Sequence, residues 1–185
     1  MNASAEKNAS YDNTMDILNR QMTELSLNDQ FLSFSVGDEE YAVEVLMVQE
    51  IIRYVNPTKI PNSPSVIKGI INFRGKIIPI IDLPVKFGLT DRKYDSFTII
   101  IVLEVKGKIM GIIVDSVSDV LSFAPDEIQD VNEELGSEIN IEHVAGLGKL
   151  ENGRLVQILA VDKLLSIEEI VAMQKIKKEK IEDEE

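Results

Sequence analysis

The chain has 185 residues, of which 44% are hydrophobic, with no cysteine, one histidine and a formal net charge of −13. This composition supplies enough apolar side chains for a folded core, and it excludes disulfides, cysteine nucleophiles and multi-histidine metal sites. The acidic excess would repel a phosphate backbone, so we expect no nucleic-acid partner. The sequence has neither a basic start followed by an apolar run nor about 18 uninterrupted apolar residues. We therefore expect a cytoplasmic protein with no signal peptide and no membrane insertion.

Residues 1–29 are polar and are predicted to form a flexible N-terminal segment. Within this segment the apolar residues Met15, Leu18, Met22 and Leu25 recur at helical spacing. The pattern favours a short tail helix that docks weakly or frays over a helix that binds a specific partner.

From Phe31 onward the pattern favours β-strands joined by tight turns. Four predicted hairpins share apolar runs on both sides of a glycine-containing turn. Their turns are at Gly37, Arg74-Gly75, Lys106-Gly107 and Asn152-Gly153. Between the first two hairpins, three prolines exclude a regular central strand and favour an extended connection; they are Pro57, Pro61 and Pro64. A long polar connection is expected from Ser122 to His143.

The two halves of the chain resemble each other in order and spacing. Residues 41–52 align with residues 110–121 at a constant offset of 69, so that Val48 falls on Val117 and Glu50 on Asp119. Each half supplies about five strands, which is typical of small closed β units. The predicted subdomains, residues 30–93 and 94–166, are each so small that a single core is marginal, so we expect them to share apolar surface.

The C-terminal residues 167–185 are predicted to form a helix followed by an acidic tail. Ser166 and Glu169 have the spacing of a capping box at the start of that helix.

Four aspartates are the candidate catalytic groups, because paired carboxylates can perform acid–base chemistry. They are Asp82, Asp115, Asp119 and Asp162. Each one stands where a predicted strand ends or a turn begins, where aspartate ordinarily accepts hydrogen bonds from backbone N–H groups. A carboxylate-based hydrolase therefore stays only as an alternative of another class. We expect a protein that is not an enzyme and that has no cofactor and no metal.

Two sets of residues allow both a structural and a binding interpretation. The apolar residues Val43, Val45, Val48 and Ile51 fit a core by their periodicity, or a docking patch if some of them lie outside the β units. Arg74 fits either a solubilising turn position or an interface position where its guanidinium meets a partner carboxylate.

Several segments resemble a known family. YAVEVLMVQEII, IKGIINFRGKIIPIIDLPVKFG and MGIIVDSVSDVL are similar to the signature segments of the CheW family, the coupling proteins of bacterial chemotaxis. GLGKLENGRLVQILAVDKLL resembles the C-terminal hairpin of that family, and the resemblance covers about residues 31–170. Phe73 stands where the family usually has leucine, and Pro84 where a basic residue is common.

The resemblance implies an all-β fold: two five-stranded SH3-like β-barrels packed side by side, with a short C-terminal helix. It also implies a non-catalytic adaptor that joins the cytoplasmic tip of chemoreceptors (methyl-accepting chemotaxis proteins) to the regulatory domain of the histidine kinase CheA. The adaptor would be associated with receptor arrays at the inner face of the membrane.

By position, the resemblance implies a receptor-binding groove of Val45, Val48, Glu50, Asn72, Arg74, Val117 and Val120. It implies a kinase-binding surface of Pro57, Ile60, Pro61 and Gly69. Two alternatives stay within the family. One is a coupler of another sensory or motility kinase. The other is a fragment of a CheV or CheA protein, which we do not expect because no foldable sequence follows residue 170.

Overall fold

The structure is a computed structural model, and it describes residues 13–19, 29–89, 91–131, 142–166, 169–170, 172–175 and 178. Met22, Leu25, the acidic tail beyond residue 178 and much of the expected polar connection before His143 lie outside these residues. Within the described ranges, no helix has the length and apolar character that crossing a membrane requires.

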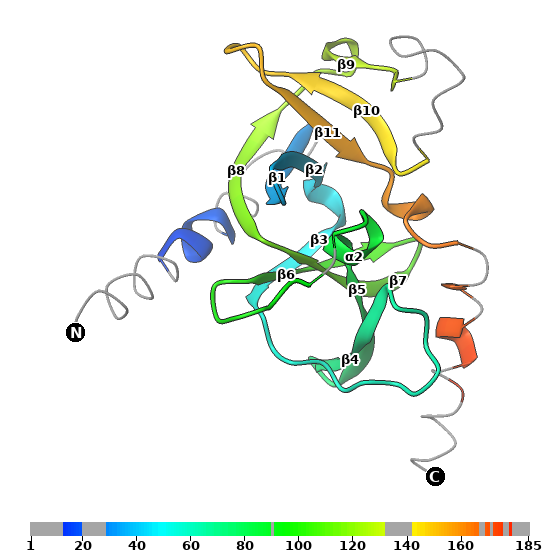
Figure 1. The fold of residues 1–185 in the computed structure, drawn as a ribbon. Coiled ribbons are helices and arrows are strands. Elements are labelled where there is room, and N and C mark those ends of the chain that lie inside the picture. The colour runs from blue at the N-terminus through cyan, green and yellow to red at the C-terminus, as the bar shows by residue number, and fades with distance from the viewer. Residues whose placement is uncertain are drawn as a thin grey trace.

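The described chain consists mainly of β-strands with short helical turns between them (Figure 1). In chain order the elements are β1 (Gln30–Val36), β2 (Glu39–Glu44), η1 (Val45–Met47), β3 (Val48–Arg53), β4 (Ile67–Phe73), β5 (Lys76–Asp82), α2 (Leu83–Lys86), β6 (Ile99–Val105), β7 (Lys108–Val114), β8 (Ser116–Ser122), η2 (Pro125–Glu127), β9 (Ile128–Gln129), β10 (Val144–Lys149), β11 (Leu155–Leu159) and η3 (Val161–Lys163). Residues 13–19, before β1, are helical, as are 169–170, 172–175 and 178 at the other end.

The strands form two sheets, which confirms the all-β class. Sheet A has the order β8-β1-β2-β11-β10-β9, and sheet B has the order β3-β6-β7-β5-β4. Each sheet combines the first hairpin of one half of the sequence with the remaining strands of the other half. The expected subdomains, 30–93 and 94–166, stay a prediction as folding units, but the hydrogen-bonded sheets do not follow that boundary.

The internal repeat is present in the strand pairing as well as in the sequence. Phe34 pairs with Val117 in sheet A, and Leu103 pairs with Val48 in sheet B. Leu103 follows Phe34 by 69 residues, and Val117 follows Val48 by the same 69 residues, so the two pairs are equivalent in the repeat. Each sheet also has a register shift next to this pair. It lies between Leu32 and Phe34 in sheet A and between Val48 and Glu50 in sheet B. The repeat therefore describes two sheets of the same design that exchange their first hairpins.

All four predicted hairpins are confirmed: β1–β2, β4–β5, β6–β7 and β10–β11. In the second, Arg74 and Gly75 have φ angles of 51° and 80°, and in the third, Lys106 and Gly107 have 51° and 77°. Two successive residues with positive φ make the turn that matches the twist of two antiparallel strands. The proline-containing connection before β4 is also confirmed as non-strand, except for one bridge between Thr58 and Ile70.

The largest core cluster contains side chains from both sheets. This agrees with the expectation that the two halves of the chain share apolar surface. Leu32 and Phe34 of β1 belong to it together with Ile101 and Leu103 of β6, and all four are fully buried. The alternate residues of the same strands, such as Phe31 and Ile100, belong to two smaller clusters. Successive side chains of a strand point to opposite faces of its sheet. One face of each sheet therefore contributes to the shared core, and the other face contributes to a smaller core of its own.

Both terminal helices have anchors. Leu18 in helix 13–19 is only 4% exposed and belongs to the largest cluster, so this helix docks through one buried side chain. At the other end the predicted capping box is confirmed. The Ser166 N–H donates to Glu169 Oε2 at 2.8 Å, and the Glu169 N–H donates to Ser166 Oγ at 3.2 Å. Glu169 also forms an ion pair with Lys86 of α2 at 3.1 Å.

Candidate partner-binding surface

The tip of the β4–β5 hairpin carries the two polar residues that were predicted to face a partner. The Asn72 side-chain oxygen accepts a hydrogen bond from the Gly75 N–H at 3.0 Å, so this amide shapes the turn. The Arg74 guanidinium donates to Glu50 Oε2 at 2.8 Å and lies 5.0 Å from the centre of the Phe73 ring. The Arg74 side chain is still 66% exposed. Its planar fork is therefore oriented and remains accessible to a partner carboxylate.

The same ion pair brings the predicted residues of β3 and of the β4–β5 tip to one place. β3 and β4 are the outermost strands of sheet B. A contact of 2.8 Å between Glu50 on β3 and Arg74 at the end of β4 requires the sheet to curl until its two ends approach each other. Closure into an SH3-like barrel stays a prediction.

The predicted valines divide into one buried residue and three half-buried ones. Val45 is 3% exposed and belongs to the largest core cluster, so its side chain lies beneath the surface and does not line it. Val48, Val117 and Val120 are half-buried and pack against that same cluster. Val48 lies on β3 and the other two on β8, and these are the outermost strands of sheets B and A. The structure therefore packs these three valines against one core cluster. They lie on strands that are hydrogen-bonded to a neighbouring strand on one side only.

Leu46, two residues before Val48, is a large exposed apolar residue that the sequence pattern did not indicate. Its side chain is 56% exposed between the buried Val45 and the half-buried Met47. Residues 45–47 form a 3₁₀ turn between β2 and β3. The buried and exposed alternation that runs from Val43 to Leu46 ends there, because Met47 and Val48 are both half-buried. A large exposed aliphatic residue beside Val48 adds apolar area that a partner can cover.

The predicted kinase-binding residues lie along the outer edge of β4. Pro57 and Gly69 are buried, Ile60 is half-buried and Pro61 is exposed. A Cβ at Gly69 would lie 2.8 Å from the carbonyl carbon of Thr58 and 2.9 Å from the Cβ of Pro57. Gly69 therefore lets the proline segment pack directly on β4, while Ile60 and Pro61 supply the accessible part of this surface.

The four candidate catalytic aspartates all have structural partners. Asp82 is buried, caps α2 through the Val85 N–H at 3.2 Å and accepts a hydrogen bond from the Tyr94 hydroxyl. Burial, followed by this hydrogen bond to Asp82, raises the pKa of Tyr94. Asp115 accepts from the Gly37 N–H at 2.7 Å. The remaining two bind the Val120 N–H and the Lys106 ammonium; they are Asp119 and Asp162.

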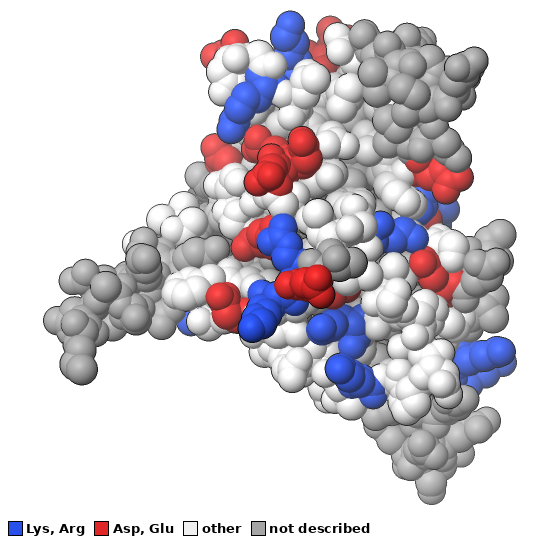
Figure 2. Space-filling model, viewed as in Figure 1, with Lys and Arg blue, Asp and Glu red and all other residues white. Residues whose placement is uncertain are grey.

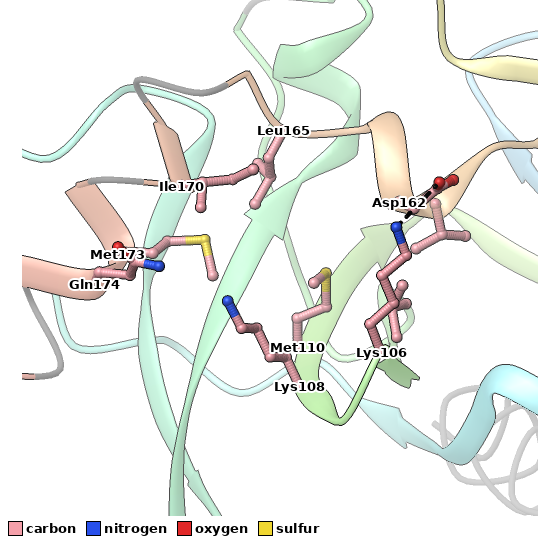
Figure 3. Close-up of a pocket in the computed structure, with 10 residues that line it drawn as sticks. Lys106, Lys108, Met110, Asp162, Leu165, Ile170, Met173 and Gln174 are labelled. Carbon is pink, nitrogen blue, oxygen red and sulfur yellow. Dashed lines mark ion pairs between the residues drawn. The ribbon is translucent and has the colours of Figure 1, made fainter.

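A separate apolar pocket of about 260 Å³ lies between the β6–β7 hairpin and the C-terminal helical residues (Figure 3). Met110 and Met173 line it, and the Lys106–Asp162 ion pair lies at its margin together with Lys108. The residues predicted to bind a receptor or a kinase do not line this pocket. It is therefore distinct from both predicted surfaces.

Charged side chains of both signs are interspersed on the face shown in Figure 2. Acidic and basic groups lie close enough to form ion pairs between elements, such as Arg92 with Asp115 at 3.4 Å and Arg154 with Glu40 at 3.5 Å. This face offers no continuous basic field to a phosphate backbone.

The family model described as "CheW-like domain" matches residues 30–178, which include every residue of the two predicted surfaces. The chain belongs to the CheW family. The CheW-family relatives include "Chemotaxis protein CheW" of Klebsiella aerogenes, which is 41% identical over 153 residues, covering 83% of this chain and 91% of that protein. The protein of the same name in Helicobacter pylori is 35% identical over 136 residues, covering 74% of this chain and 81% of the relative.

A solved CheW-family structure has the same fold. The crystal structure of the scaffolding protein TtCheW from Thermoanaerobacter tengcongensis is similar with a TM-score of 0.68 and 33% identity. The match covers 76% of this chain and 94% of that one. The sheets that carry the candidate surfaces therefore belong to an architecture that this family shares.

Proposed function

We propose that this CheW-family chain is a non-catalytic adaptor that couples chemoreceptors to the histidine kinase CheA in chemotaxis signalling. The observation that carries the proposal is the packing of half-buried valines from β3 and β8, outermost strands of the two sheets, on one core cluster. The exposed Arg74 pairs with Glu50 on β3. In this proposal the protein works in the cytoplasm, at receptor arrays on the inner face of the membrane.

The receptor-facing part of the proposal uses apolar contact and one directed charge. A receptor tip is a helical hairpin, and an amphipathic helix binds by laying its apolar face on an apolar surface. Val48, Val117, Val120 and the exposed Leu46 supply that surface. Arg74 supplies a directed donor at its margin, where an arginine that meets a carboxylate contributes specificity.

The kinase-facing part of the proposal uses the proline segment on the outer edge of β4. Pro57 and Gly69 are buried and hold the segment in place, while Ile60 and Pro61 remain available for contact. Because this surface is formed by other residues than the receptor surface, one adaptor molecule has separate contacts to offer to two partners. The regulatory domain of CheA is the proposed occupant.

The two contacts are separable by experiment. Sedimentation with membranes that carry chemoreceptors measures the first contact, and binding to the isolated regulatory domain of CheA measures the second. We expect Arg74→Glu to weaken only the first and Pro61→Asp only the second. If the wild-type protein bound neither partner, the chemotaxis proposal would be wrong, and partners from another sensory or motility kinase pathway would be tested in the same way.

A further inference from the structure

The helix at residues 13–19 lies against the body of the protein through one side of its surface. Leu18 is 4% exposed and Met15 is half-buried, and both pack in the largest core cluster. Ile17, on the other side of the helix, is 48% exposed. The helix is therefore amphipathic in its contacts, with a buried face and a face open to solvent.

The buried face joins the same cluster as the proposed receptor surface. Val48, Val117 and Val120 pack against the cluster that contains Leu18. Figure 1 shows helix 13–19, in blue, beside β8, the strand that carries two of these three valines. An amphipathic helix thus packs on the same core cluster as the valines of the proposed receptor surface.

We propose that helix 13–19 is an intramolecular competitor for the receptor-binding surface, which a receptor must displace in order to bind. This inference rests on the proposed function and adds a regulation of the same site. A segment tethered close to its binding surface has a high effective concentration, so it competes without needing strong contacts. Leu18 is the one buried side chain among the described residues of this helix, so its docking depends on a single anchor and can be displaced.

The first test compares two neighbouring residues of the full-length protein. Leu18→Asp removes the buried anchor of the helix, and Ile17→Asp places the same charge on its exposed face. We expect Leu18→Asp to tighten binding to a receptor cytoplasmic fragment about 3- to 10-fold, because the competing state is removed. Ile17→Asp should leave the Kd unchanged. The thermal midpoint of each variant shows that the body of the protein is still folded.

The second test detects displacement directly. The chain contains no cysteine, so Ile17→Cys provides a single labelling position for a nitroxide spin label on the exposed face of the helix. Adding the receptor fragment should increase the mobility of the label, because linkage requires that the receptor weaken helix docking as much as the helix weakens receptor binding. Adding the CheA regulatory domain should leave the mobility unchanged.

The outcomes separate this inference from the proposed function. If the receptor fragment binds the wild type and Leu18→Asp equally, or binds Leu18→Asp more weakly, the competitor proposal is overturned while the adaptor function stands. An unchanged label mobility at saturating receptor fragment has the same meaning. If the wild type and Leu18→Asp both fail to bind the receptor fragment, the proposed function is wrong and the competitor proposal falls with it.

Discussion

The Arg74 guanidinium and the Glu50 carboxylate, 2.8 Å apart, connect the tip of the β4–β5 hairpin to the opposite outermost strand of sheet B. Their side chains are 66% and 33% exposed. Exposed ion pairs contribute about 0–1 kcal/mol to stability, so this pair matters more for the orientation of Arg74 than for the fold. The pair holds the Arg74 guanidinium beside β3, the strand that also carries Val48.

Charge reversal at Arg74 should separate binding from stability. We expect Arg74→Glu to weaken receptor binding at least about 10-fold, because a lost and reversed interface charge costs more than about 1.4 kcal/mol. The thermal midpoint should change little, since the side chain is exposed. Sedimentation with receptor membranes and differential scanning calorimetry provide the two measurements.

Arg154 offers a matched control for that experiment. It follows the turn of the β10–β11 hairpin, pairs with Glu40 at 3.5 Å and has a side chain that is 61% exposed. Arg154→Glu should leave receptor binding unchanged. Equal losses in the two variants would mean that net charge, rather than the position of Arg74, governs binding.

Leu46 should behave as a contact residue and not as a core residue. Because it is 56% exposed, Leu46→Asp should change the free energy of unfolding by less than about 0.5 kcal/mol. Binding to receptor membranes should nevertheless decrease, since a charge would enter an apolar interface. Leu155→Asp on β11, where the leucine is 52% exposed, should leave binding intact. Unimpaired binding of Leu46→Asp would remove Leu46 from the proposed surface.

Gly69→Ala should disturb the proline segment. The added Cβ would lie 2.9 Å or less from Pro57 and Thr58 backbone or side-chain atoms, so we expect a loss of about 2 kcal/mol in unfolding free energy. Binding to the CheA regulatory domain should weaken as well. Gly107→Ala, at a positive φ of 77° in open space, should cost only ~1 kcal/mol and leave kinase binding unchanged. Denaturant unfolding measures the loss of unfolding free energy in both variants. Equal losses in Gly69→Ala and Gly107→Ala would show that the close approach at Gly69 is unimportant.

Tyr94 should make stability fall at alkaline pH. Burial and then the hydrogen bond to Asp82 raise the pKa of Tyr94 above its ordinary value of 10.0. The folded state therefore retains a proton that the unfolded state releases. Its contribution to stability is complete below pH 10 and is lost as the pH rises towards the folded-state pKa.

The measurement for Tyr94 is urea unfolding between about pH 8 and 11. Tyr94→Phe should lower stability below pH 10, because Asp82 loses a donor, and should make the alkaline decline less steep. Burial also raises the pKa values of Tyr41 and Tyr54, so part of the slope should remain. Identical slopes for wild type and Tyr94→Phe would contradict this assignment.

The two halves of the sequence should not fold independently. Each sheet takes strands from both halves, and the largest core cluster does the same. We expect fragments 30–93 and 94–166 to lack cooperative thermal unfolding when separate and to recover β-sheet circular dichroism when mixed. Cooperative unfolding of either fragment alone would show that its strands can form a closed unit without exchange.

Local signals explain what the sequence predicted and what it missed. The turns at Arg74-Gly75 and Lys106-Gly107 depend on neighbouring residues only, so their hairpins were predictable. The exchange of first hairpins depends on pairing between distant strands, for which a single sequence has no local signal. Likewise, Met47 and Val48 are both half-buried at the end of the 3₁₀ turn, and the alternation of a strand does not predict this. The close approach of Gly69 to Thr58 is also a long-range contact.

The most direct test of the adaptor proposal is a reconstitution that measures CheA autophosphorylation with receptor-containing membranes and this protein. We predict that kinase activity rises only when receptor, kinase and adaptor are all present, and that Arg74→Glu lowers the stimulation while Arg154→Glu does not. Stimulation by receptors that is equally strong without the adaptor, or no stimulation by the wild-type protein, would contradict the account.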